Sequence, residues 1–288
     1  MAKSALLKSS IGKKYWMALT GLFLCLFLAG HLAGNLQLIF GTPLQFNEYA
    51  LFMTTNPAVK LLSYLTYISI LFHAVDGILL TIQNKKARPV GYAKNNAAAN
   101  SGFASRNMAV LGTLILFFIA THMVNFWAKM HFDENMPLMT KSIEIQPGQI
   151  QEFYVGTQTG QYFPIEQVEV GKHTEAHNHA PKQYQLKNKT ELFFSQVDVK
   201  TADLYKDLHK ITFAFFKHPK TGLIATIGYV LAMIVLGFHL WHGFQSAFQS
   251  LGVNSPKLNS TIKFAGKAFA VIVPLLFAII PIYIHFTK

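Results

Sequence analysis

Apolar residues occur along this chain in five long runs rather than in short alternating segments. The runs cover residues 14–40, 57–83, 108–130, 220–248 and 262–286. A helix needs roughly 20 mostly apolar residues to cross the hydrocarbon core of a bilayer. The pattern therefore predicts an all-α integral membrane protein with a bundle of five transmembrane helices. The first run is too long for a signal-peptide core and no small-residue cleavage site follows it, so we expect a retained helix.

A long polar segment, residues 131–218, separates the third run from the fourth. It contains short β-branched and aromatic stretches broken by Gly and Pro, which predict hairpin strands. Its last part, residues 199–216, has the pattern of an amphipathic helix lying along the membrane interface. The chain is thus divided into helices 1–3 at 1–130, a mixed extramembrane insertion at 131–218, and helices 4–5 at 219–288.

The insertion also contains a short histidine-rich stretch, "GKHTEAHNHAPK". His173, His177 and His179 are spaced closely enough to bind a metal ion. Spacing alone is weak evidence for such a site. A solvated, disordered tip is the favoured interpretation.

Composition supports the membrane assignment, since 51% of the residues are hydrophobic and only 13% are charged. Soluble domains carry about 25% charged residues. The net charge of +12 would suit nucleic acid, but its distribution argues against that partner. Segments 1–14, 84–107 and 250–267 hold twelve Lys or Arg residues and no acid, whereas the insertion holds nine Lys and eleven acids.

Short basic segments mark the cytoplasmic side of a membrane protein. The N-terminus and the loops 84–107 and 249–261 are therefore expected inside. Loop 41–56, the insertion and the C-terminus are then expected outside. All three basic segments agree on this topology.

Four histidines lie within four different apolar runs: His31, His73, His122 and His239. Ionisable side chains inside a membrane are costly and are usually functional. With a rise of about 1.5 Å per residue, His31 and His122 lie about 4–6 Å outside the midplane, and His73 and His239 about 4–8 Å inside it. The depths predict two pairs, His31 with His122 and His73 with His239, in planes roughly 10 Å apart.

Two histidine pairs on neighbouring helices suit two flat, axially ligated cofactors, and haem is the leading candidate because histidine is a standard axial ligand of its iron. The chain has one cysteine, Cys25, and no C-x-x-C-H motif, which excludes covalent c-type haem and predicts b-type haem. A single histidine could instead hydrogen-bond a neighbouring helix. Two depth-matched pairs are harder to explain in that way.

His242 follows His239 by three residues and lies on nearly the same helix face. We favour His239 as the iron ligand and His242 as a neighbour of the haem or its propionates, because His242 matches the depth of His73 less well. Glu48 is the only acid in the first outside loop. Its carboxylate could pass protons to and from a quinone, or be a solvated loop charge, and the residues alone leave both interpretations open.

Four sequence motifs carry a resemblance to a known family. They are "GKKYWMALTGLFLCLFLAGHLAGNLQLIFG", "LFHAVDGILL", "ATHMVNFW" and "FHLWHGFQSAFQSLG". They resemble the ligand-bearing helices of the di-haem, five-helix cytochrome b subunit of succinate dehydrogenases and fumarate reductases. The resemblance covers all five helices, roughly 200 residues, and leaves out most of 131–200.

The resemblance implies that His31 and His122 bind the outer haem b, and that His73 and His239 bind the inner one. Some fumarate reductases of the family place a glutamate near the outer quinone site, at about the position of Glu48. Some members of the family have an acid beside the fourth-helix ligand for compensating proton transfer. Here the adjacent residues are Phe238 and Leu240, so that proton route is not expected.

The family implies a function in the bacterial inner membrane. The chain would pass electrons through two haems to menaquinone as the membrane anchor of a succinate:quinone oxidoreductase. It contains no dinucleotide fingerprint and no iron–sulfur cysteine set, so flavin and clusters would belong to a flavoprotein and an iron–sulfur subunit on the cytoplasmic side. Two rivals remain: a di-haem cytochrome b of another respiratory complex, and a non-haem transporter with a histidine proton relay.

Overall fold

The computed structural model describes residues 9–91, 94, 96–170 and 182–287. The histidines weighed as candidate metal ligands, His173, His177 and His179, lie outside these residues. The chain divides into two compact units. The helical unit comprises the described residues of 1–40, 56–122 and 215–288, and the insertion unit comprises those of 41–55 and 123–214.

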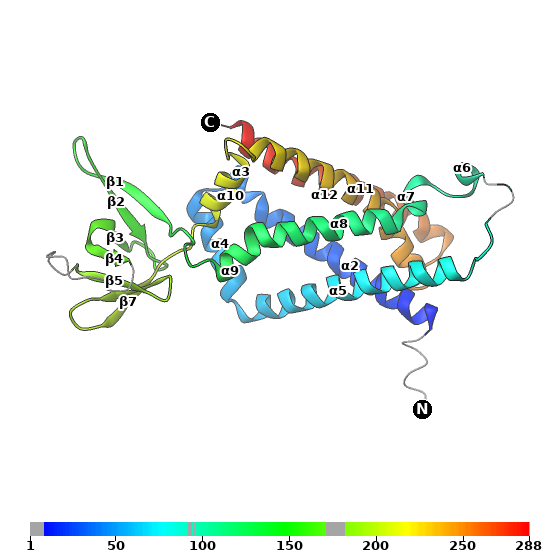
Figure 1. Ribbon diagram of the computed structural model, residues 1–288, viewed down its shortest axis with the longest axis horizontal. Helices are drawn as coiled ribbons and strands as arrows, with labels where there is room; N and C mark the ends of the chain where they lie inside the picture. Colours follow the sequence, from blue (N-terminus) through cyan, green and yellow to red (C-terminus); the bar gives the residue numbers. More distant parts are fainter. Residues whose placement is uncertain (1–8, 92–93, 95, 171–181, 288) are drawn as a thin grey trace, which may run out of the picture. The chain divides into compact units, whose positions relative to one another are not determined.

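The helical unit contains the long helices of the chain (Figure 1). Their bounds are α2 Ser10–Asn35, α5 Pro57–Lys86, α8 Met108–His122, α11 Gly222–Ser250 and α12 Pro256–Phe286. Shorter helices are α3 Gln37–Phe40, α6 Ala97–Asn100 and α7 Phe103–Arg106. Five helical stretches are long and apolar enough to cross a membrane: Ser10–Phe40, Pro57–Lys86, Met108–Phe132, Gly222–Ser250 and Pro256–Phe286. The prediction of five helices long and apolar enough to cross a membrane is confirmed, and each extends beyond its apolar run at one end.

Local sequence explains where these helices begin. The hydroxyl of Ser9 accepts a hydrogen bond from the Gly12 amide and caps α2. Asn56 caps α5 through its side-chain oxygen. Pro57 lies in the first turn, where the missing backbone N–H of a proline would have had no partner within the helix. Ser255 and Pro256 repeat this arrangement at the start of α12.

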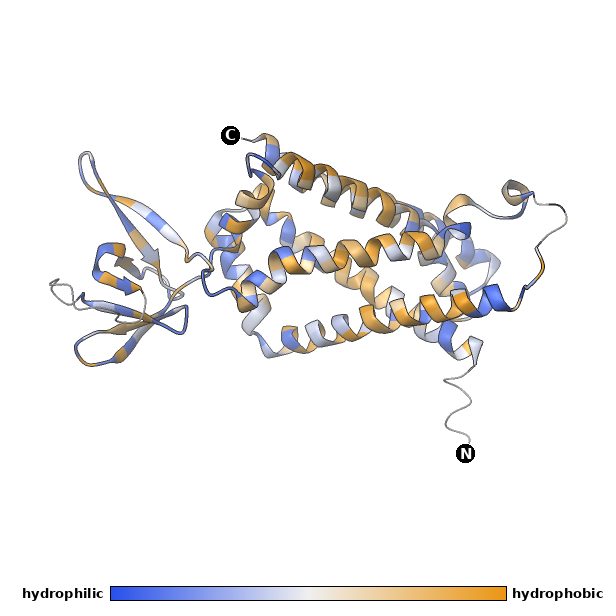
Figure 2. Cartoon of the chain, viewed as in Figure 1, coloured by the Kyte–Doolittle hydropathy of each residue, from blue (hydrophilic) through white to orange (hydrophobic). Residues whose placement is uncertain are grey.

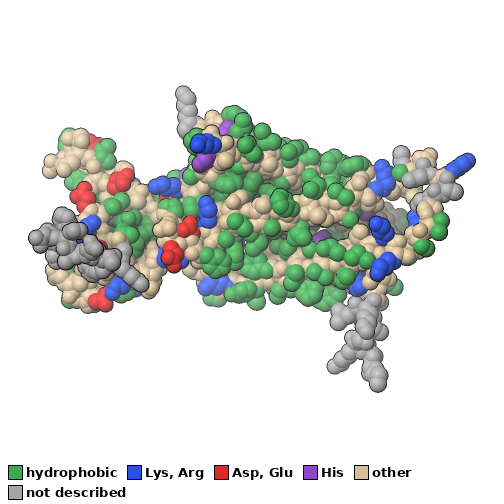
Figure 3. All heavy atoms as spheres, viewed as in Figure 1, with side chains coloured by type: hydrophobic (Ala, Val, Ile, Leu, Met, Phe, Trp, Pro, Cys, Tyr) green, Lys and Arg blue, Asp and Glu red, His purple; other side chains and the backbone are tan. Residues whose placement is uncertain are grey.

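The helical unit has a core of its own between α2, α11 and α12. Cys25, Leu236 and Ala270 are buried there, and Gly237 lets α11 approach α12 closely. A Cβ on that glycine would lie 3.1 Å from the backbone oxygen of Ala270. Most residues of the long helices are hydrophobic (Figure 2), and apolar side chains cover much of the face of these helices that Figure 3 shows. An outer surface of this kind is what a lipid-facing bundle requires.

The insertion unit combines helices with two sheets. The helices are α4 Pro43–Thr55, the π-helical turn η2 Met123–Ala128, α9 Lys129–Phe132, the 3-10 turn η3 Ile165–Gln167 and α10 Leu208–Phe216. The last two residues of α10, 215 and 216, belong to the helical unit. One antiparallel sheet has the order β1 Thr140–Gln146, β2 Gln149–Val155, β3 Tyr162–Pro164. The other has the order β4 Val168–Val170, β5 Tyr184–Lys187, β6 Glu191–Phe194, β7 Val199–Asp203, with β4 and β5 parallel.

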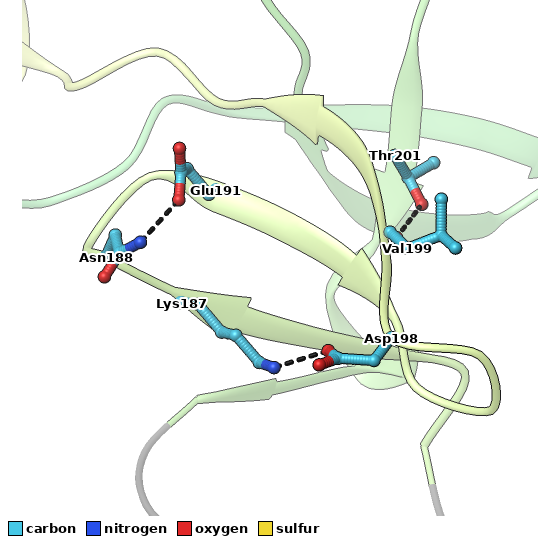
Figure 4. A network of polar contacts seen from close by, with 6 residues as sticks. All are labelled: Lys187, Asn188, Glu191, Asp198, Val199 and Thr201. Atoms are coloured by element: carbon cyan, nitrogen blue, oxygen red, sulfur yellow. Dashed lines mark hydrogen bonds and ion pairs between the residues drawn. The ribbon is translucent and has the colours of Figure 1, made fainter.

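Short turns and exposed charges organise the second sheet. Asn188 and Asp198 have positive φ angles of 47° and 53° in the connections that flank β6. Lys187 pairs with Asp198, and the Asn188 side chain donates to Glu191 (Figure 4). The apolar face of this sheet buries Leu192 completely. Leu192 belongs to a buried apolar cluster that also contains Phe163 of β3 and Val168 of β4.

The strands predicted within residues 131–218 are present as two sheets, and the all-α description holds for the helical unit alone. Two predictions in the insertion unit need correction. The helix predicted at 199–216 begins only at Leu208, since residues 199–203 pair with β6 as strand β7. The expected loop at 41–56 contains α4, whose Asn47 is buried and hydrogen-bonded to Asp207. In both segments, partners far along the chain decide the local structure.

Candidate functional site

The four membrane histidines come together as two pairs within the helical unit. The ring centroids of His31 and His122 lie 5.9 Å apart, and those of His73 and His239 lie 6.1 Å apart. Each pair joins two different helices, α2 with α8 and α5 with α11. This is the arrangement that the depths along the helices predict.

The centroid distances suit one metal atom between two rings. Two imidazoles that bind one metal from opposite sides, through bonds of about 2 Å each, hold their ring centroids about 6 Å apart. Within the described part of the chain, no group of three or more His, Cys, Asp or Glu side chains could hold a bare ion. Two ligands are the number that a bis-histidine haem iron takes from protein. The donor set therefore fits haem better than a mononuclear metal site.

Neighbouring atoms on α2 determine which ring nitrogen of His73 carries the proton. Its Nδ1 lies 3.2 Å from the backbone oxygen of Met17 and 3.3 Å from the hydroxyl oxygen of Thr20. A carbonyl oxygen only accepts, so Nδ1 carries the proton and donates it. Nε2 is then left with its lone pair, which is the state that a metal ligand needs.

Two glycines allow helices to approach the inner pair. A Cβ at Gly21 on α2 would lie 3.2 Å from Cε1 of His73, and a Cβ at Gly112 on α8 would lie 3.6 Å from Cε1 of His239. Nδ1 of His239 is buried and has no hydrogen-bond partner among the described residues. Iron bound through Nε2 of His239 would leave Nδ1 in this unpaired state.

The outer pair is surrounded by aromatic rings. Phe27 stacks near His31 with centroids 5.2 Å apart, and Phe118 stacks near His122 at 5.7 Å. Nδ1 of His122 lies 3.3 Å from the hydroxyl of Tyr229 on α11. Each histidine of the outer pair therefore has an apolar ring stacked beside it.

Sequence reasoning missed two polar neighbours of the outer pair. Asn35 on α2 places its amide nitrogen 3.4 Å from Nδ1 of His31, and Tyr229 approaches His122. The sequence does contain a signal for Tyr229, because its hydroxyl group is a polar group inside the apolar run 220–248. The π-helical turn η2 follows His122 directly and was not predicted either. Such turns inside helices are often found at functional sites.

His242 lies one turn further along α11 and is partly buried. The ring that packs against His73 is that of His239. This geometry favours His239 over His242 as the partner of His73. The ligand role itself stays a prediction.

Glu48 lies on α4 in the insertion unit, and its side chain is exposed. The neighbouring residue Asn47 anchors the helix by donating to Asp207 over 2.9 Å and by accepting from the His209 amide. Burial raises the pKa of Tyr205, and the negative charge of Glu48 raises it further. The histidines belong to the other unit, so the role of Glu48 in a quinone site stays a prediction.

Comparisons with protein-family models, with curated protein sequences and with solved structures found no match to this chain. The histidine geometry and the sequence resemblance are the features of the chain that bear on its function.

Proposed function

We propose that this chain is the haem b-containing membrane anchor of a succinate:quinone oxidoreductase. The observation that carries the proposal is the placement of four histidines from four apolar helices into two pairs, with ring centroids 5.9 and 6.1 Å apart. The five helices support a multi-pass membrane protein. The resemblance of the four histidine motifs supports the choice of this enzyme over other di-haem cytochromes.

In this proposal His31 and His122 hold the outer haem, and His73 and His239 hold the inner one. Bound haem would supply one-electron carriers between an iron–sulfur subunit and menaquinone. The protein fixes ring orientation, as the Met17 carbonyl does for His73, and keeps water away with packed apolar side chains. Glu48 would exchange protons with quinone at the outer face.

The proposed partners, a flavoprotein and an iron–sulfur subunit, would dock on the basic cytoplasmic face. Lys85 and Lys86 lie in the last turn of α5. In the loop that follows, the Arg106 side chain donates a hydrogen bond to the backbone oxygen of Ala97. With these segments inside, the N-terminus is cytoplasmic and the C-terminus lies outside in the bacterial inner membrane. The charge distribution supports this orientation.

A redox-titrated absorption spectrum of the purified complex tests the proposal. We expect two low-spin b-type haems per chain, both reduced on addition of succinate. His31→Ala and His122→Ala should each remove one haem, and His73→Ala and His239→Ala the other. Tyr64→Phe, at an exposed position on α5, is a matched control that should retain both.

Two outcomes would contradict the proposal in different ways. A complex without haem bands would favour a transporter that uses the histidines as a proton relay. A complex with two haems that succinate does not reduce, and that lacks a flavoprotein, would assign the chain to another respiratory complex.

A further inference from the structure

Tyr229 on α11 reaches the outer histidine pair. Its hydroxyl lies 3.3 Å from Nδ1 of His122 on α8. Either atom can donate in this contact, depending on the tautomer of the imidazole. If Nε2 of His122 binds an iron, Nδ1 must carry the ring proton, and the tyrosine oxygen then accepts it.

Three phenylalanine rings hold Tyr229 in place. Their centroids lie 4.9 Å (Phe118), 5.8 Å (Phe215) and 5.0 Å (Phe216) from the tyrosine ring, all with edge contacts. Edge-to-face contacts of this kind fix ring orientation as well as burying apolar area. The hydroxyl is therefore held at one position relative to His122.

The segment that covers Tyr229 is itself fixed. The backbone oxygen of Phe216 accepts a hydrogen bond of 2.7 Å from Nδ1 of His285 on α12. Gly222, at the start of α11, lies so close that a Cβ would be 2.3 Å from the same oxygen. Only a glycine permits this approach, which brings the chain back over the tyrosine.

We propose that Tyr229 is a positioning residue for the outer haem. Its hydroxyl oxygen accepts the Nδ1 proton of His122, selects the tautomer that leaves Nε2 for the iron, and lowers the midpoint potential of that haem. The inference rests on the proposed function. It goes beyond that function by identifying a residue of α11 that determines how much negative charge His122 of α8 carries at the nitrogen facing the iron.

The direction of the effect follows from charge. An imidazole that donates from Nδ1 gains negative character at the nitrogen on the iron. Added negative charge stabilises the ferric state more than the ferrous state, so removing the acceptor raises the potential. The inner ligand His73 has a backbone acceptor, Met17, which a side-chain substitution does not remove.

Tyr229→Phe in the full complex tests the inference, because it removes one oxygen and retains the aromatic packing. We expect both haems to remain bound. The ratio of oxidised to reduced outer haem at a fixed potential should fall by up to about tenfold. For a one-electron couple this corresponds to a rise in midpoint potential of up to about 59 mV. The inner haem should not change, and Tyr64→Phe should change neither. His31→Ala, which leaves only the inner haem, assigns the two potentials.

An unchanged outer potential in Tyr229→Phe with both haems present would overturn the inference and leave the proposed function intact. Should the variant lose the outer haem, a fluorotyrosine at position 229 retains the ring and hydroxyl but accepts more weakly. A smaller rise in outer potential then supports the inference, and no rise overturns it. A wild-type complex without haem would instead overturn the proposed function.

Discussion

Gly21 offers a sharp test of the inner histidine site, because the helix that carries it packs directly against His73. A Cβ at Gly21 would lie 3.2 Å from Cε1 of His73, whereas carbon atoms in good contact lie about 3.5–4.0 Å apart. Gly21→Ala therefore requires the His73 ring to move by a few tenths of an ångström, which restores a normal carbon–carbon distance. Valine adds two more methyl groups in the same place. We therefore expect Gly21→Val to displace His73 from the position that faces His239.

The magnitude follows from the cost of overpacking, which is about 1–3 kcal/mol for extra methyl groups in a packed interior. At 1.4 kcal/mol per factor of ten, this is an about 5- to 150-fold loss of affinity for the inner haem. Displacement also stretches the hydrogen bond from His73 to Met17, 3.2 Å long in the intact protein. Under the proposed function, the His73–His239 site should lose haem while the His31–His122 site retains it.

Haem content per purified chain, measured as the pyridine haemochrome, is the readout. Gly112→Ala is a graded comparison, since its Cβ would lie at an ordinary contact distance of 3.6 Å from His239. Gly228→Val is the matched control, because Gly228 is exposed and has nothing within 4 Å of the added Cβ. Two haems of wild-type affinity in Gly21→Val would refute the geometry assigned to His73.

Four further outcomes are expected. His242→Ala should spare the inner haem that His239→Ala removes, and the opposite result, read from the absorption spectrum, would exchange their roles. Glu48→Gln should strongly reduce succinate:menaquinone turnover while both haems stay reducible by succinate; unchanged turnover would leave Glu48 as a surface charge. Leu192→Ala, at a fully buried position, should destabilise the second sheet by about 2–5 kcal/mol, measured by hydrogen exchange in the intact chain, with exposed Val197→Ala as the control. Burial lowers the pKa of His209, although the charge of Asp207 opposes the shift. Below about pH 6.5 the unfolded insertion unit therefore binds more protons than the folded one. The free energy of unfolding of this unit should fall as the pH drops through that range. His209→Gln should flatten that dependence, and an equally steep loss in the variant would assign it to another group.

Much of the membrane architecture follows from the sequence alone. The five apolar runs predict the five long helices because a spanning helix satisfies every backbone hydrogen bond within its own segment. The pairing of His31 with His122 and of His73 with His239 also follows, since a constant rise per residue converts sequence position into depth. These features depend on local or one-dimensional properties of the chain.

The insertion unit required the tertiary structure. Residues 199–203 have a pattern compatible with a helix, but pairing with β6 makes them a strand. Helix α4 was expected to be a loop, and Asn47 fixes it through a partner 160 residues away, Asp207. Sequence spacing carries no information about such contacts, because the energy comes from burial and hydrogen bonding between distant segments.

The same distinction holds at the candidate site. The sequence identified the four histidines, since a polar side chain stands out in an apolar run. Only the folded chain showed that Met17 accepts a hydrogen bond from His73, that Gly21 touches that ring, and that Tyr229 reaches His122. Each of these contacts joins two helices, so it depends on how the helices are rotated about their axes and how closely they pack. Depth along one helix determines neither quantity.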